Sequence, residues 1–262
     1  MKKVFNLFFI SVFVIILTSC TADADDIVQV KLVQKIIEVN EDETSSTINF
    51  TYAGEKISSI ESEEIIKTFF YTENLITKIV EVNKTTQAQT TFDYTYTNNL
   101  LTKVVSSDNY TLNYIHQANG SILYTKTTTD SNNNIVLIWN GTMSLHSNNI
   151  TENNKTSENS NANILTKKGF NFNYDTKFNP LKNIIGFNKL LDYSNIISKN
   201  NVTAIVEINY TKFLDSEAEV SSANVIIKKY NYDKEGYPKE VISTKPVFGK
   251  EDENHLKTLY FY

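Results

Sequence analysis

Two groups of carboxylates and three histidines are the side chains of this sequence best suited to acid–base chemistry. Glu41, Asp42 and Glu43 form one acidic group, and a second, Glu-rich group follows at residues 61–64. Paired carboxylates can act as a general acid and a general base, but both groups fall in predicted turns, where acidic side chains are normally solvated. The histidines are scattered and form no metalloprotease pattern; they are His116, His146 and His255. The sequence therefore predicts no catalytic residue.

Metal binding is weakly supported by the sequence. Asp130 opens the stretch DSNNN, which has the spacing of the first ligands of a calcium loop. The sixth position should be glycine and is Ile135, and the twelfth should be glutamate and is Gly141. A single cysteine and three separated histidines also do not supply the usual zinc ligands. We therefore expect a hairpin turn here, and no metal or other cofactor.

Cys20 is the only cysteine, and it follows a segment with the features of a signal peptide. Lys2 and Lys3 precede an apolar run over residues 4–17, which is shorter than the roughly 18 residues that a membrane-spanning helix needs. The run ends in LTSC, the pattern of a bacterial lipobox, whose cysteine is acylated with chains such as palmitate before cleavage. The sequence predicts a signal peptide over residues 1–19 and lipid attachment at Cys20.

The residues after this cysteine predict a tether and a location. TADADD follows Cys20, so residues 20–26 read as the acylated cysteine with a short acidic linker. Position 21 is threonine, whereas aspartate there is the familiar signal for retention in the inner membrane. We therefore expect a lipid anchor in the outer membrane. The protein could face either the periplasm or the cell surface. The cell surface is slightly favoured, because acidic residues after the cysteine resemble the surface-export signal of Bacteroidota lipoproteins.

The charge of the chain argues against nucleic acid as a partner. The formal net charge is -5, and every basic residue is lysine. An acidic surface repels a nucleic-acid backbone. Without arginine, the chain also has no bidentate guanidinium for phosphate.

Aromatic residues two positions apart predict the architecture. Phe92, Tyr94 and Tyr96 alternate with polar residues, and the same period recurs from one end of the chain to the other. Period two places each set on one face of a strand. Residues 27–262 are therefore expected to form a single, mainly β domain, an extended antiparallel sheet or a partly open barrel of repeated hairpins.

One phrase occurs twice, as FNYDTKFNPLKNI from Phe170 and as YNYDKEGYPKEVI from Tyr230. Asp175 and Asp233 occupy the same place in the two copies, at the end of an aromatic strand. Aspartate there can accept hydrogen bonds from backbone N–H groups a residue or two further on. We interpret the phrase as the corner of a repeated hairpin.

Two segments depart from the strand pattern. Residues 147–168 are polar and rich in asparagine, which predicts a long loop. Pro180 follows an asparagine at a suitable first helical position, and apolar residues at helical spacing follow it. We expect one short helical segment near residues 180–197, interrupted near Gly186.

The chain from Val30 onwards resembles an uncharacterised family of Bacteroidota outer-membrane lipoproteins. The resemblance rests on the lipobox, on segments such as FTYAGEKISSI and YTENLITKIV, and on the two YD phrases, which are similar to degenerate YD repeats. It implies a porin-like antiparallel β architecture and no known activity. Most of the glycines of full YD repeats are missing, so a closed cocoon of the RHS type is not expected.

The tyrosine rows are the candidate binding surface. Aromatic pairs stabilise sheets by about 0.2–1 kcal/mol each, but an exposed row could also stack on a glycan or grip a peptide. The candidate aromatic face comprises Tyr94, Tyr96, Tyr114, Tyr174 and Tyr232. The favoured function is a non-enzymatic, lipid-anchored binding or scaffold domain for a glycan or protein. The alternatives are an accessory subunit of an outer-membrane complex, which a pull-down would reveal, and a polysaccharide-acting hydrolase. The oligomeric state stays open.

Overall fold

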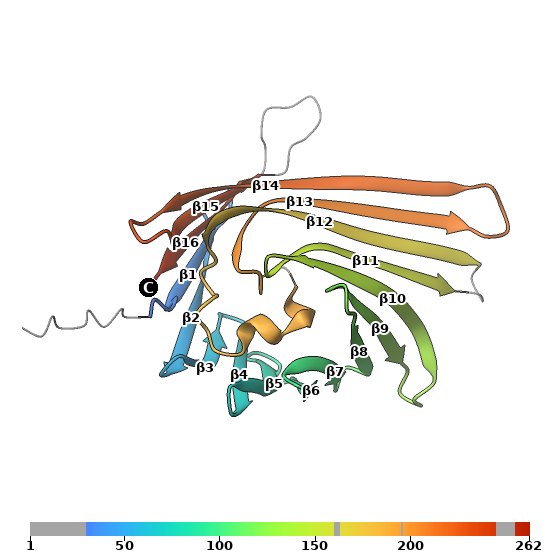
Figure 1. The fold of residues 1–262 in the computed structure, drawn as a ribbon, viewed down its shortest axis with the longest axis horizontal. Coiled ribbons are helices and arrows are strands. Elements are labelled where there is room, and N and C mark those ends of the chain that lie inside the picture. Colours follow the sequence, from blue (N-terminus) through green and yellow to red (C-terminus); the bar gives the residue numbers. More distant parts are fainter. Residues whose placement is uncertain (1–29, 160–162, 195, 245–254) are drawn as a thin grey trace, which may run out of the picture. The chain divides into compact units, whose positions relative to one another are not determined.

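The protein forms a closed antiparallel barrel of 16 strands (Figure 1). The computed structural model describes residues 30–159, 163–194, 196–244 and 255–262. Each strand pairs with its neighbours in sequence, and β1 pairs with β16 to close the barrel. The strands are β1 (Lys35–Val39), β2 (Ser45–Ala53), β3 (Lys56–Glu61), β4 (Ile65–Thr72), β5 (Leu75–Asn83), β6 (Gln89–Thr97), β7 (Leu100–Ser106), β8 (Tyr110–His116), β9 (Ile122–Thr129), β10 (Ile135–His146), β11 (Asn149–Asn159), β12 (Ile164–Phe178), β13 (Asn200–Phe213), β14 (Glu219–Tyr232), β15 (Pro238–Thr244) and β16 (His255–Phe261).

The mainly β prediction is confirmed, but the sheet is neither extended nor partly open. Lys35 to Val39 pair in register with Phe261 to Lys257, so the first and last strands leave no free edge between them. A free edge would expose unpaired N–H and C=O groups, and closure removes it. The pairing of two segments so far apart in the sequence could not be read from local patterns.

The apolar face of most strands points into the barrel. On β6, Tyr94 is buried while its neighbours Asp93 and Thr95 are exposed. The same alternation on the other strands assembles a core from isoleucine, leucine, valine and tyrosine side chains, among them Ile79, Leu101 and Tyr114. The period-two pattern therefore separates the interior of the barrel from its outer surface.

The connection between β12 and β13 fills part of the barrel interior. These residues, 179–199, are called the plug below; Figure 1 shows them as a coiled segment enclosed by the strands. Two 3-10 turns lie in the plug, η1 (Phe187–Lys189) and η2 (Leu191–Tyr193). The single helical segment predicted for residues 180–197 is therefore only partly right.

Contacts with the barrel wall explain why the plug does not form one regular helix. Gly186 has a φ of 76°, a left-handed conformation suited to glycine. Next to Gly186, the backbone of the plug binds the barrel instead of continuing a helix: the N–H of Ile185 donates to the carbonyl of Glu55 at 3.1 Å. Most of the apolar residues with helical spacing are buried, but against the barrel rather than along one helix face; the buried ones are Leu181, Ile184, Leu191 and Ile197.

The loop predicted for residues 147–168 is wrong over most of its length. Strands β11 and β12 cover residues 149–159 and 164–178 and pair with each other from Glu152–Asn171 to Asn159–Ile164; residues 160–162 lie outside the described residues. The polar composition was misleading because polar side chains have internal partners here. Asn153, for example, accepts a hydrogen bond from Tyr124 and donates one to Ser194 of the plug.

Tyrosines near the ends of several strands make the same hydrogen bond, from the side-chain hydroxyl to a backbone carbonyl. The hydroxyl of Tyr96 on β6 donates to the carbonyl of Ile76 on β5 at 2.9 Å. Equivalent bonds recur around the barrel between a strand and the strand before it, and His116 on β8 makes the same kind of contact with Leu101 O on β7. The other tyrosine–carbonyl pairs are Tyr52–Val33, Tyr174–Ile150, Tyr230–Val202 and Tyr262–Pro238. The tyrosine thus satisfies a backbone acceptor at one end of the barrel.

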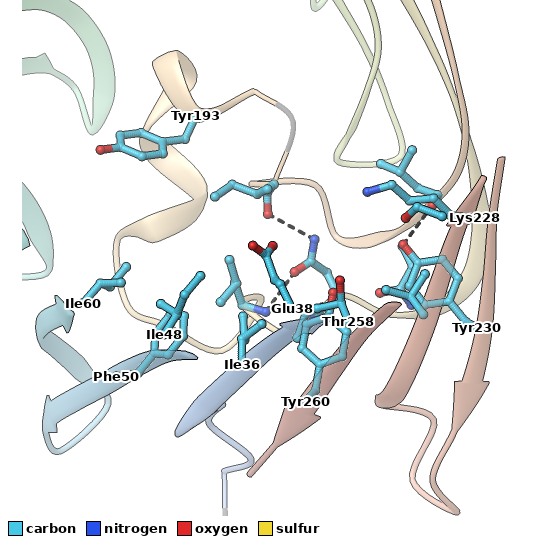
Figure 2. A pocket seen from close by; sticks show the side chains of 18 of the residues that line it. Ile36, Glu38, Ile48, Phe50, Ile60, Tyr193, Lys228, Tyr230, Thr258 and Tyr260 are labelled. Carbon is cyan, nitrogen blue, oxygen red and sulfur yellow. Dashed lines mark hydrogen bonds between the residues drawn. The ribbon is translucent and has the colours of Figure 1, made fainter. Parts of the chain in front are cut away.

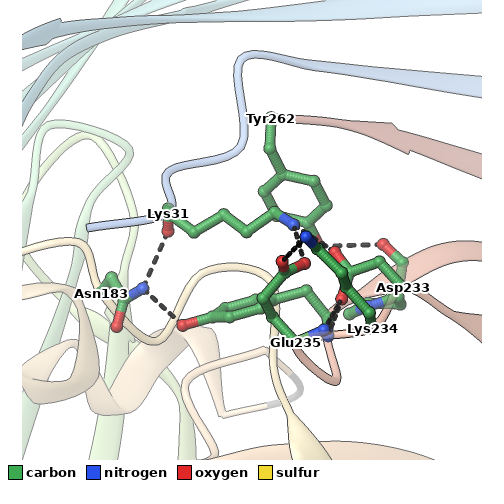
Figure 3. Close-up of polar contacts among 8 residues, drawn as sticks. Lys31, Asn183, Asp233, Lys234, Glu235 and Tyr262 are labelled. Atoms are coloured by element: carbon green, nitrogen blue, oxygen red, sulfur yellow. Dashed lines mark hydrogen bonds and ion pairs between the residues drawn. The ribbon is translucent and has the colours of Figure 1, made fainter. Parts of the chain in front are cut away.

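The two aspartates of the repeated phrase are turn formers, as predicted. Asp175 Oδ1 accepts the N–H of Lys177 at 2.9 Å. Asp233 Oδ1 accepts the N–H groups of Glu235 and Tyr237 at 3.0 and 2.9 Å. Figure 3 shows that Asp233 and Glu235 also pair with Lys31, which precedes β1. The turn at Asp233 therefore also links the start of β1 to the turn before β15, on either side of the β1–β16 pairing.

The outward positions carry mostly threonine, serine, asparagine and lysine. On β9 the outward residues include Thr125 and Thr127, and on β12 they include Lys167 and Asn171. An apolar strip covers part of β13, β14 and β15; it consists of Val206, Ile208, Val225, Ile227 and Ile242. Among the described residues, no helix is long and apolar enough to cross a membrane.

Candidate functional site

A cavity of about 380 Å³ lies inside the barrel, between the plug and the wall that contains the closure (Figure 2). Its wall is built by β14, β15, β16, β1, β2 and β3, and its opposite side by the plug. The lining residues used below are Ile36, Glu38, Ile48, Phe50, Ile60, Leu181, Phe187, Tyr193, Lys228, Tyr230, Thr258 and Tyr260. A concave and mainly apolar space of this size is typical of a small-molecule site.

Strand alternation positions the apolar part of the cavity. Ile36 on β1 pairs with Ile48 on β2, and Phe50 on β2 pairs with Ile60 on β3, all on the inner face. From the plug, Phe187 packs in the core at 1% exposure. These side chains offer a ligand dispersion contacts and a surface from which water is readily displaced.

Two lysines, Lys67 and Lys228, and one glutamate, Glu38, give the cavity its charge. Lys228 lies on β14 between inward-facing Ile226 and Tyr230, and Figure 2 shows it reaching into the cavity on the side opposite the isoleucines. Burial lowers the pKa of Lys228, while the negative charge of Glu38 on β1 opposes this change. The two groups belong to strands separated by β15 and β16, so polar ends of a ligand could contact both.

Tyrosines complete the polar lining. Tyr230 donates its hydroxyl hydrogen to Val202 O at 2.9 Å, and burial raises its pKa. Burial also raises the pKa of Tyr260 and of Tyr193, so all three stay neutral over the physiological pH range. Lys67, beside Tyr193, forms an ion pair with Glu81 at 2.8 Å. Lys228 is therefore the cation of this cavity that is best placed to receive an anionic group.

A second polar cluster lies where the plug meets the opposite wall. Tyr94 donates to Asp192 Oδ2 at 2.9 Å. Asp192 keeps some exposed surface as a residue, but its Oδ1 atom is buried, as is the Tyr114 hydroxyl, and neither has a hydrogen-bond partner among the described residues. Burial raises the pKa of Asp192 to about 6, although the bond from Tyr94 opposes this shift.

The five tyrosines of the predicted aromatic face point into the barrel, not onto an open sheet. Four have occupied hydroxyls: Tyr94 binds Asp192, Tyr96 binds Ile76 O, Tyr174 binds Ile150 O and Ser198, and Tyr232 binds Asp175. Tyr114 is buried at 4% exposure. They form part of the inner wall, so an external platform for glycan stacking is not their place in the structure.

The remaining sequence candidates are not brought together. Glu41, Asp42 and Glu43 are exposed in the turn after β1, and His146 is exposed at the end of β10. Asp130 accepts two backbone N–H groups in its own turn. Within the described ranges no group of three or more His, Cys, Asp or Glu side chains is placed to hold a metal ion. Cys20 lies outside the described residues, and the absence of enzymatic activity stays a prediction.

Sequence reasoning missed Lys228, Glu38 and Asp192. The sequence does contain a signal for Lys228 and Glu38, since each lies two positions from an apolar residue and therefore on the same strand face. Lys228 lies between Ile226 and Tyr230, and Glu38 lies two residues after Ile36. Asp192 follows two leucines in the apolar plug. A charged residue at a core position is informative, because its burial is costly without a partner.

The comparisons with known proteins support the fold. No protein-family model matches this chain, and no curated protein matches it. A porin-like protein from Bacteroides vulgatus has a similar structure, with a TM-score of 0.58 and 12% identity over 89% of this chain and 99% of that one. A porin-like protein from Bacteroides uniformis superposes with a TM-score of 0.48 and 11% identity over 87% of this chain and 97% of that one. The first of these shows that the chain has a porin-like β fold.

Proposed function

We propose that this protein is a non-enzymatic lipoprotein, anchored in the outer membrane through Cys20, whose barrel binds a small amphipathic molecule in its interior. The observation that carries the proposal is the cavity between the plug and the closure wall, with its apolar lining and its inward lysine. The porin-like fold is consistent with an outer-membrane protein. The lipobox supports the anchor.

The surface of the barrel supports attachment by lipid rather than by insertion of the strands. A transmembrane barrel presents an apolar band about 25 Å tall to the lipid, with aromatic girdles and a polar interior. Here tyrosines and isoleucines fill much of the interior, although lysines also point inward from β9, β11 and β12, and polar side chains occupy most outward positions. The apolar strip on β13–β15 covers only part of the circumference, and the other exposed apolar residues, such as Phe70, Ile115 and Phe261, share their strands with outward polar residues. We infer that water surrounds the barrel and that the acyl chains hold the protein at the membrane.

The chemistry of the cavity defines the ligand class. Ile36, Ile48 and Phe50 would contact an apolar ring or short chain. Lys228 would pair with a carboxylate or sulfonate, because a charge-assisted bond to a partly buried ammonium is stronger than one between neutral groups. The ligand is therefore a compact, mainly apolar molecule with one anionic group.

Filling the cavity should abolish binding of such a molecule. We expect anilinonaphthalene sulfonate to bind the folded barrel, and Ile36→Trp to weaken that binding roughly tenfold or more because the indole would occupy the site. Fluorescence titration measures the affinity. Ile37→Trp is the matched control, since the adjacent side chain points outward; it should bind the dye as the wild type does.

Two further comparisons make this test specific. Lys228→Met should weaken the anionic dye but leave the neutral probe phenylnaphthylamine unchanged, because only the charge contact is lost. Thermal melting of each variant shows whether the barrel is folded at the temperature of the titration. Equal affinity in Ile36→Trp and Ile37→Trp would mean that the dye binds elsewhere, and the proposed site would be wrong.

Cys20→Ala should stop lipid attachment completely. The thiol is the group that would be acylated, and alanine has no nucleophile to replace it. Cells grown with radiolabelled palmitate should incorporate label into the wild type only, and the variant should accumulate as a larger precursor that keeps residues 1–19. Labelling of the variant at the wild-type level would contradict the proposed anchor.

The role of accessory subunit is favoured by one observation, the apolar strip of β13–β15. Exposed, contiguous apolar residues mark many protein–protein contacts. Ile208 and Val225 in this strip are 44% and 37% exposed. A stoichiometric partner in an affinity pull-down would favour this role over that of a free-standing binding protein.

A further inference from the structure

Three lysines point into the barrel from its long strands, away from the cavity described above. Lys126 lies on β9, Lys155 on β11 and Lys168 on β12. Their orientation follows from their parity with buried residues: Lys126 is two positions from Tyr124, and Lys168 is four from Phe172. Lys155 is directly opposite Lys168 in the β11–β12 ladder. These residues are called the lysine cluster below.

The lysine cluster has three ammonium groups, and the negative charge of Asp192 in the plug acts on one of them, Lys126. None of its members forms an ion pair with a carboxylate among the residues that the structure describes. Burial lowers the pKa of Lys155, and the charges of Lys168 and Lys126 lower it further. Like charges directly opposite each other in a sheet are destabilising. Facing ammonium groups that reduce the stability of the free protein are expected where an anionic ligand binds between them.

Aromatic rings hold two of the ammonium groups in place. Lys126 Nζ lies 3.8 Å from the ring centre of Tyr110, and Lys155 Nζ lies 5.1 Å from that of Trp139, the only tryptophan. A cation over an aromatic face is attracted by the ring quadrupole. These contacts orient the lysines without neutralising their charge, so the ammonium groups still favour an anion.

The strand spacing sets the size of the anion. Neighbouring strands are about 4.8 Å apart, so β11 and β12 place Lys155 and Lys168 about 5 Å apart at the backbone, and β9 is about 10 Å from β11. Long side chains can converge on one group or spread over two. We propose that the lysine cluster is a binding site for an oligoanion, a molecule with at least two carboxylate, sulfate or phosphate groups within about 10 Å of each other.

This site is distinct from the one that Lys228 provides. The lysine cluster shares no residue with the lining of the 380 Å³ cavity. The two sites also differ in chemistry, since the cavity is mainly apolar and one of its two lysines, Lys67, pairs with Glu81, whereas the lysine cluster is polycationic. Binding at one can therefore fail while binding at the other is retained.

The test measures binding of pyrophosphate and of trigalacturonate by titration calorimetry, with maltotriose as the uncharged control. The wild type should bind at least one of the two anions, more weakly at higher salt, and should not bind maltotriose. Lys155→Gln/Lys168→Gln should weaken that binding roughly tenfold or more, because two charge-assisted contacts are lost. Pyrophosphate alone would indicate a compact phosphate, and trigalacturonate alone an acidic saccharide.

Lys167→Gln is the matched control, because Lys167 adjoins Lys168 on β12 but points outward and is exposed. It should leave anion affinity unchanged. The double variant should be as stable as the wild type or more stable, since it removes repulsion, whereas a purely structural role would predict destabilisation. Dye binding in the cavity should be unaffected. No binding of either anion by the wild type, or equal affinity in the double variant, would overturn the proposal.

Discussion

Asp192→Asn should raise the free energy of unfolding by up to about 3 kcal/mol at pH 8 and by almost nothing at pH 4. The carboxyl group of Asp192 is held between the plug and the inner wall, where its Oδ1 atom is buried without a described partner. Burial raises its pKa from 3.8 to about 6. A shift of about two units corresponds to about 3 kcal/mol, because each unit is worth about 1.36 kcal/mol.

The direction of the pH dependence follows from proton binding. Between pH 4 and pH 6 the folded protein keeps the proton of Asp192, whereas the unfolded chain has lost it. This contribution to stability is complete below pH 4, falls as the pH rises through 6, and then stays constant. Asparagine does not titrate, so the variant should lack this fall. Denaturant unfolding at pH 4, 6 and 8 measures the difference between wild type and variant.

Two controls separate this effect from a general change in charge. Asp93→Asn removes the carboxylate of the residue that precedes Tyr94 on β6. Asp93 points outward, and its side chain is 60% exposed. It should change stability little at any of the three pH values. Tyr94→Phe removes the hydroxyl that stabilises the charged form and should therefore destabilise the protein more at pH 8 than at pH 4. A pH-independent gain in Asp192→Asn would contradict the buried carboxylate.

The fold was predictable where it depends on local alternation. Phe92, Tyr94 and Tyr96 have period two in the sequence and lie on the inner face of β6 in the structure. The turn role of Asp175 and Asp233 was also readable, because an aspartate bonds the backbone two residues away and needs no distant partner.

Closure of the barrel and the structure of β11 were not predictable from local patterns. Closure pairs Lys35 with Phe261, and no periodicity specifies which strand meets the first one. The asparagine-rich composition of residues 147–168 predicts a loop, because side chains of this kind normally face water. In the barrel, Asn153 on β11 has two internal hydrogen-bond partners, so a polar side chain can face inward at low cost.

The candidate sites escaped prediction for a related reason. Lys228 and Glu38 come together only because β14 and β1 belong to one closed wall. The inward tyrosines were assigned to an exposed face because an open sheet has one solvated side, and a closed barrel with a plug does not. Their burial turns a candidate glycan platform into the wall of an interior space.

Asp233→Ala should lower the free energy of unfolding by about 2 kcal/mol at pH 7, more than a turn contact alone would cost. Asp233 Oδ1 accepts two backbone N–H groups at 2.9 and 3.0 Å, and Oδ2 pairs with Lys31 (Figure 3). Burial alone would raise the pKa of Asp233, but the bonds from Lys31 and from the Tyr237 N–H hold it below its usual value. This contribution is therefore present above pH 4 and is lost as the pH falls through the lowered pKa.

Asp130→Ala is the matched control, because Asp130 also accepts two backbone N–H groups, at 2.9 and 2.8 Å, in an exposed turn without a lysine partner. Its cost should be about 1 kcal/mol or less. Asp233→Asn should fall between the two, since the amide oxygen still accepts the turn bonds while the charge on Lys31 loses its partner. Equal losses for Asp233→Ala and Asp130→Ala would show that the Lys31 contact adds nothing.

Asp233→Ala is expected to lose more unfolding free energy than Asp130→Ala because of the position of Lys31, the partner of Asp233. Lys31 precedes β1, and Asp233 precedes β15, so their pair spans β16 and the closure of the barrel. Asn183 of the plug reinforces the same place by donating to Lys31 O and to the Tyr237 hydroxyl, each at 2.8 Å. The β1–β16 pairing joins the first strand to the last, so forming it closes the longest loop and costs the most chain entropy. Contacts across it should therefore show in the unfolding rate as well as in the equilibrium, and stopped-flow unfolding of Asp233→Ala should be faster than that of Asp130→Ala.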